Sequence, residues 1–172
     1  MNILVLGVGN EILTDDGVGP RIAEGAQQRW FGTGVRFQTT FQAGMPLVDL
    51  VTGSDVLIII DAIRTGGRPG ELYWLDPEDM PCGDGASVPE HKIGILKALK
   101  LGRALGLAMP ERVFVLAVEA ADVTTFGEEL TPEVAASVPG AIRQVLNKLT
   151  EITRYPEAVR KEALSFPPER KE

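Results

Sequence analysis

A chain of 172 residues, 44% of them hydrophobic, is long enough to bury a core and suits a single domain. Its net charge of −7 disfavours nucleic acid as a partner, because an acidic surface repels phosphate groups. The lone cysteine, Cys82, leaves no basis for an internal disulfide framework or a cysteine metal cluster. The amino terminus has neither a basic region nor a long apolar segment. We therefore expect no signal peptide, no membrane contact and a cytoplasmic location.

The chain opens with a strand followed by an acidic loop. Residues 2–6 are almost wholly apolar, as expected for a strand buried on both faces. The polar loop after Gly7 carries Asn10, Glu11, Asp15 and Asp16. Open α/β sheets bind their ligands at the carboxyl ends of the strands. The loop therefore puts carboxylates where such a sheet has its site.

Helix-like and strand-like segments alternate through the rest of the chain. The expected elements are a helix at 17–30, a strand at 35–41, a short helix at 46–51, strands at 55–62 and 71–75, a helix that follows a cap at residue 87 and ends near 105, a strand at 112–118 and a helix from 131 to 149. Ser87 and Glu90 fit a capping box before the third helix, and Pro139 is expected to kink or divide the last one. This alternation predicts a mostly parallel sheet covered on both faces, within an α/β fold.

The sequence Gly7-Val8-Gly9 suggests a dinucleotide-binding turn, but its context is wrong. Ile12 stands where the third glycine of that fingerprint belongs, and no acidic residue ends the second strand. We therefore expect these glycines to allow a tight exit from the first strand, without binding a nucleotide. No Gly-x-Ser-x-Gly elbow occurs, which disfavours a serine hydrolase of that design.

Three residues from separate parts of the chain form the candidate site. Asp16 lies in the first loop, Asp61 directly follows the apolar residues 58–60, and His91, the only histidine, begins a predicted helix. Taken singly, each has an ordinary explanation as a turn, cap or surface residue. In a parallel sheet all three would reach one edge, where two carboxylates and an imidazole suit zinc or nickel with an open coordination position.

Three further acidic residues compete with or extend this set. Asp15 and Glu11 lie close enough to Asp16 to take its place, because in a loop any of them can turn inward. Glu119 ends the strand at 112–118 and would lie at the same edge, although a solvated strand end explains it equally well.

Six segments carry a pattern that goes beyond these single residues. They are residues 3–10, residues 13–19, Ala43-Gly44-Met45, Ile59-Ile60-Asp61-Ala62, His91-Lys92-Ile93-Gly94 and Leu130-Thr131-Pro132. In order and spacing, residues 1–149 resemble the [NiFe]-hydrogenase maturation endopeptidases. Residues 150–172 lie outside the resemblance and are expected to form a charged, flexible tail.

The resemblance implies a three-layer α/β/α sandwich around a five-stranded twisted sheet. It implies an endopeptidase that removes the carboxy-terminal extension of the nickel-loaded hydrogenase large-subunit precursor. The sequence does not show the oligomeric state, and we expect a monomer to act on this large precursor. Asp16, Asp61 and His91 would be both the metal-binding and the catalytic residues. The nickel would be carried by the substrate, and zinc or cadmium would replace it in crystals.

The chain departs from the family pattern at two places. The first metal-binding position, often glutamate in the family, is the shorter Asp16 here, and residues 39–42 lack the aspartate that many members carry. Two alternatives also remain: a peptidyl-tRNA hydrolase-like enzyme and a non-enzymatic nickel-dependent docking protein. The acidic charge and the absence of a histidine before His91 count against the first alternative.

Overall fold

A computed structural model describes residues 1–42, 45–77 and 90–153, with only the backbone described for residues 90–94. Its elements follow the order expected from the sequence. They are β1 (Ile3–Val8), the 3-10 helix η1 (Thr14–Gly17), α1 (Val18–Gln27), β2 (Val35–Thr40), α2 (Met45–Val51), β3 (Val56–Ile63), β4 (Leu72–Leu75), α3 (Glu90–Ala104), β5 (Arg112–Glu119) and α4 (Pro132–Thr153).

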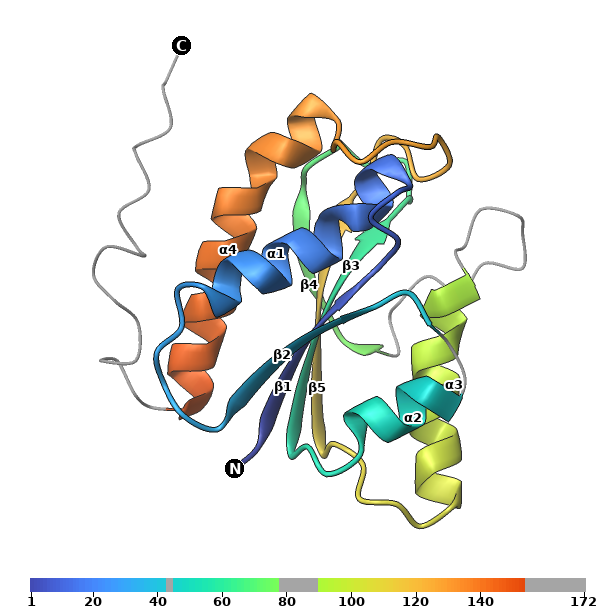
Figure 1. Ribbon diagram of the computed structural model, residues 1–172, viewed down its shortest axis with the longest axis vertical. Coiled ribbons are helices and arrows are strands. Elements are labelled where there is room, and N and C mark those ends of the chain that lie inside the picture. The colour runs from blue at the N-terminus through green and yellow to red at the C-terminus, as the bar shows by residue number, and fades with distance from the viewer. Residues whose placement is uncertain (43–44, 78–89, 154–172) are drawn as a thin grey trace.

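The five strands form one sheet in the order β2-β1-β3-β5-β4. The first four strands in this order are parallel, and β4 runs antiparallel to β5. Helices α1 and α4 cover one face, and α2 and α3 cover the other (Figure 1). The predicted α/β sandwich around a mostly parallel five-stranded sheet is therefore confirmed.

Strand β3 shows how the sequence produces the three layers. All its residues are buried, because β3 lies inside the sheet and helices cover both faces. Ile58 and Ile60 belong to the apolar cluster under α1 and α4, whereas Leu57 and Ile59 belong to the cluster under α2 and α3. Alternate side chains of one apolar run thus supply two cores.

Several expected boundaries shift in the structure. β1 continues through Gly7 to Val8, and β3 continues past Asp61 to Ile63, so that Asp61 lies within its strand. Pro139 lies inside the single helix α4 and does not divide it. Buried residues on both sides of Pro139, including Val134 and Ala141, hold the two parts against the same core.

Some expectations lie outside the described residues. These include the capping-box serine Ser87 and the tail beyond residue 153. Within the described part of the chain, no helix is both long and apolar enough to cross a membrane.

Candidate active site

Glycines bring the start of α1 directly onto the ends of two strands. A Cβ atom on Gly19 would lie 2.4 Å from the carbonyl oxygens of both Val8 and Ile60, and one on Gly7 would lie 2.5 Å from the Gly19 carbonyl oxygen. Such distances leave no room for any side chain. The glycines of the first loop therefore allow close backbone packing, in agreement with the expected tight strand exit.

The same packing folds the acidic loop back over the strand. Gly9 has a φ of +139°, and a Cβ atom on it would lie 1.8 Å from the carbonyl oxygen of Asp16. The Asn10 backbone N–H donates to Asp16 Oδ2 at 2.7 Å. Asp16 is only 3% exposed. Its carboxylate is thus fixed at the carboxyl end of β1, where the sequence predicted it.

Asp15 has a separate, structural role. Its carboxylate accepts hydrogen bonds from the backbone N–H groups of Ala121, Asp122 and Thr131 at 2.7–3.0 Å, and from the Thr131 hydroxyl. These bonds tie η1 to the segment between β5 and α4. Glu11 is exposed. Of the three acidic residues in the loop, Asp16 therefore remains the candidate for the site.

The segment that Asp15 holds is itself ordered by local bonds. Asp122 Oδ1 accepts hydrogen bonds from Thr125 and Thr124, and these hold the pKa of Asp122 well below its usual range. Leu13 and Gly127 form a short parallel bridge, and the Thr14 N–H donates to the Gly127 carbonyl at 2.8 Å. The first loop and the β5–α4 segment thus form one unit beside the site.

Asp61 is fully buried and lies beside Ala117 of β5. It alternates along β3 with Leu57 and Ile59, which pack under α2 and α3, so its side chain is on the sheet face that α3 covers. η1 contacts β3, which brings the loop of Asp16 to the same strand. His91 lies in the first turn of α3, where the structure describes only the backbone.

Asp16, in the loop after β1, and Asp61, near the carboxyl end of β3, thus lie on elements that contact each other at this edge of the sheet. Carboxylate oxygens are suitable ligands for a divalent cation, so these two residues are chemically suited to bind one. Among the side chains that the structure describes, no group of three potential metal ligands comes together. The side chain of His91 is not among them, so the predicted three-residue set stays a prediction.

Glu119 is a residue whose role the sequence did not reveal. It is buried, and its carboxylate accepts hydrogen bonds from the backbone N–H groups of Thr65, Gly66 and Gly67 and from the Thr65 hydroxyl at 2.7–3.2 Å. It therefore shapes the loop after β3, rather than being a solvated strand end. The signal in the sequence was an acidic strand end combined with a glycine-rich exit from the neighbouring strand.

This loop borders a cavity of about 420 Å³ at the carboxyl ends of β3 and β5. Apart from the cation Arg64 and the buried carboxylate Glu119, the residues that line it are small. The lining consists of Arg64, Gly66, Gly67, Pro69, Glu119, Ala120 and Ala121. Arg64 follows Asp61 closely along the chain, but neither Asp16 nor Asp61 lines this cavity.

Comparisons with known proteins identify the family. The family model for hydrogenase maturation proteases matches residues 42–148. A hydrogenase 2 maturation protease from Escherichia coli K12 is 35% identical over 153 residues, which cover 88% of this chain and 92% of the relative. The chain belongs to the hydrogenase maturation protease family.

Solved structures show the same fold. The protease resembles the hydrogenase maturating endopeptidase HybD from E. coli with a TM-score of 0.75 and 33% identity, over 88% of this chain and 94% of the other. It also resembles the [NiFe] hydrogenase maturation protease HybD from Thermococcus kodakarensis, with a TM-score of 0.62 and 26% identity, over 87% and 99%. The protein is therefore a peptidase, and the tRNA hydrolase and docking-protein alternatives are set aside.

Proposed function

We propose that this protease removes the carboxy-terminal extension of a [NiFe]-hydrogenase large-subunit precursor after nickel has been inserted. The family assignment supports the reaction class and the hydrogenase context. The observation that carries the proposal is the pair of buried carboxylates, Asp16 and Asp61, at the carboxyl edge of the sheet. His91, at the start of the helix that covers the Asp61 face, completes the proposed set.

In this proposal the nickel belongs to the substrate. Asp16, Asp61 and His91 bind the ion already seated in the precursor, and this contact positions the scissile peptide at the sheet edge. Oxygen and nitrogen donors hold such an ion less tightly than a closed thiolate site, which suits transient engagement. Nickel at this position supplies Lewis-acid polarisation of the peptide carbonyl or of water.

The carboxylates also have a direct part in the proposed hydrolysis. Attack by water requires a group that accepts its proton, and the buried carboxylates Asp16 and Asp61 are the groups to which we assign this role. The backbone contacts of Gly9 and Asn10 with Asp16 hold one of them in place before the substrate binds. Such preorganisation favours catalysis, because no reorganisation is needed at the moment of reaction.

The test uses purified precursor with and without nickel, and follows the mass of the large subunit. We expect the loaded precursor to lose a short carboxy-terminal peptide and the nickel-free precursor to remain intact. Asp61→Asn and His91→Ala should each slow processing by about 10²–10⁴-fold while the protein stays folded. Glu11→Gln is the matched control, since Glu11 is exposed in the same loop as Asp16.

Two results would contradict the proposal. Equal cleavage of loaded and nickel-free precursor would show that the ion is not recognised. Normal processing by both Asp61→Asn and His91→Ala would show that the site lies elsewhere.

A further inference from the structure

The edge strand β2 offers unused backbone hydrogen-bonding groups. The Ile3 N–H donates to the Gly34 carbonyl at 2.8 Å, and the Gly9 N–H donates to the Thr40 carbonyl at 3.0 Å. Backbone groups alternate in direction along a strand, so the even-numbered residues of β2 bond to β1. Val35, Phe37 and Thr39 therefore point their N–H and C=O groups outward, where no described strand pairs with them.

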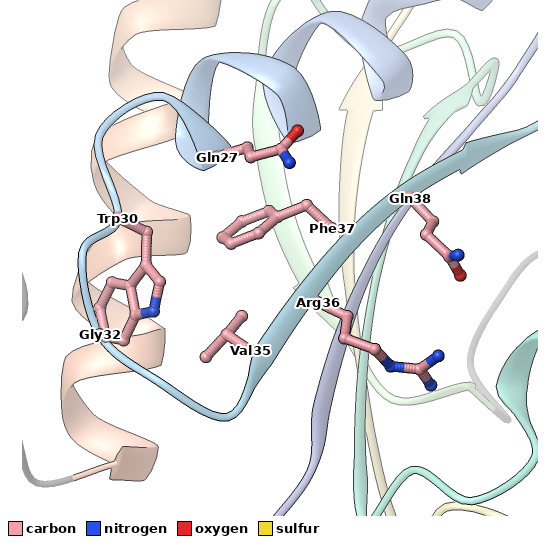
Figure 2. A pocket seen from close by; sticks show the side chains of 7 residues that line it. All are labelled: Gln27, Trp30, Gly32, Val35, Arg36, Phe37 and Gln38. Atoms are coloured by element: carbon pink, nitrogen blue, oxygen red, sulfur yellow. The ribbon is translucent and has the colours of Figure 1, made fainter.

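A cavity of about 440 Å³ runs along this edge. It is lined by Gln27, Trp30, Gly32, Val35, Arg36, Phe37 and Gln38. Figure 2 shows Val35 and Phe37 on one side of β2 and Arg36 and Gln38 on the other. Because side chains of both sheet faces line it, the cavity follows the strand edge and is not confined to one face.

Two buried polar atoms at this cavity have no hydrogen-bond partner among the residues that the structure describes. They are the indole N–H of Trp30, a residue only 7% exposed, and the side-chain oxygen of Gln38. In Figure 2 the indole nitrogen lies on the side of the ring that faces Val35. Buried polar groups in native proteins are nearly always hydrogen-bonded, so two such atoms beside one cavity point to a ligand with both donors and acceptors.

An extended peptide has this chemistry. Its backbone presents N–H and C=O groups in alternation, which match the outward groups of Val35, Phe37 and Thr39 and can also reach Trp30 and Gln38. β2 also lacks the usual protection of an edge strand: it contains no proline, and Arg36 is its only charged residue. We propose that the outer edge of β2 binds a peptide segment by strand addition.

The position of the edge identifies the peptide, and this step rests on the proposed function. β2 ends at Thr40, whose carbonyl accepts a hydrogen bond from the Gly9 N–H. A Cβ atom on Gly9 would lie 3.6 Å from the carboxyl carbon of Asp16. A segment lying on β2 therefore leads to the candidate site. We assign this segment to the precursor, because the precursor is the partner whose chain must reach that site.

The sheet geometry also gives the length of the connection. An added strand would lie three strand spacings, or about 15 Å, from β3 and Asp61. An extended chain covers this distance in roughly five residues. The precursor segment that pairs with β2 is thus separated from the scissile bond by about that number of residues.

Thr39→Pro tests the pairing, because it removes an outward N–H that β1 does not use. We expect KM for the loaded precursor to rise about tenfold and kcat to change by less than about twofold. Thr39→Val, which keeps the N–H, should leave both constants unchanged. Trp30→Phe keeps an aromatic ring but removes the indole N–H together with the five-membered ring that carries it. It should raise KM about threefold.

A second measurement does not depend on turnover. In the inactive Asp61→Asn variant, adding loaded precursor should slow hydrogen exchange at the backbone amides of Val35 and Phe37. Thr39→Pro with a normal KM, together with unprotected amides, would overturn the inference while the proposed function stands. If protection of the Val35 and Phe37 amides depended only on the concentration of this protein, the inference would also be overturned. The edge of β2 would then pair with a second copy of the chain.

The two proposals fail in different ways. If the wild-type protein does not process the precursor, the proposed function fails. Protection of the Val35 and Phe37 amides by the precursor would still support strand addition in that case.

Discussion

The backbone of Asp16 lies against Gly9 so closely that a Cβ atom on Gly9 would be 1.8 Å from the Asp16 carbonyl oxygen. This contact joins the end of β1 to η1. Together with the Asn10 N–H bond to Asp16 Oδ2, it fixes a carboxylate of the candidate site relative to the sheet. The geometry of the site therefore depends on a residue that carries no side chain.

Replacing Gly9 by alanine should displace the whole acidic loop. The backbone of Asp16 would have to move, and the φ of +139° is itself unfavourable for alanine. We expect a loss of stability well above the about 1–2 kcal/mol that a left-handed conformation costs alone, and no detectable processing. Gly53→Ala is the control, because Gly53 has a φ of +78° and nothing near its Cβ position. Thermal unfolding of both variants tests this expectation. Equal losses of stability in Gly9→Ala and Gly53→Ala would contradict it.

Asp15 and Asp16 are neighbours, yet their substitution should have opposite consequences. Asp15→Asn puts an amide group among the donors from Ala121, Asp122 and Thr131, and should cost about 3 kcal/mol of unfolding free energy. Asp16→Asn keeps an oxygen for the Asn10 N–H, and should cost less than about 1 kcal/mol while it abolishes processing. Urea unfolding and a processing assay on both variants separate the two roles. Similar stabilities would mean that Asp15 is not the anchor.

The order of elements was predictable because it depends on local patterns. Apolar runs such as residues 56–60 indicate buried strands wherever they occur, and the alternation with helices then implies a parallel sheet. The carboxyl edge followed from that topology, and with it the approximate places of Asp16 and Asp61. Local signals were less reliable for boundaries, as the uninterrupted helix across Pro139 shows.

The roles of Asp15 and Glu119 were not predictable, because their partners are distant in sequence. Asp15 accepts hydrogen bonds from residues more than a hundred positions later in the chain. Glu119 accepts hydrogen bonds from the loop that follows β3. Such roles depend on which strands are neighbours and on where loop amides point. A single sequence shows only that an acidic residue is present.

Glu119 gives a prediction about the loop after β3. Glu119→Ala would leave three backbone N–H groups without an acceptor, and should cost about 3 kcal/mol and speed hydrogen exchange at Thr65, Gly66 and Gly67. Glu119→Gln keeps an oxygen for these donors, and its amide can donate to the Thr65 hydroxyl, so it should restore most of the protection. Equal exchange in both variants would show that Glu119 does not organise the loop.

Tyr73 gives a prediction about alkaline pH. Its hydroxyl donates to Glu71, and this bond, with partial burial and the charges of Glu71 and Glu119, raises its pKa from 10.0 to about 12. The folded protein therefore keeps a proton that the unfolded chain loses, so this contribution to stability is complete below pH 10 and disappears between pH 10 and 12. In a Tyr155→Phe background, where Tyr73 is the remaining tyrosine of two, phenolate absorbance should titrate near 12. Glu71→Gln should move that titration back toward 10, and an unchanged titration would show that Glu71 is not the cause.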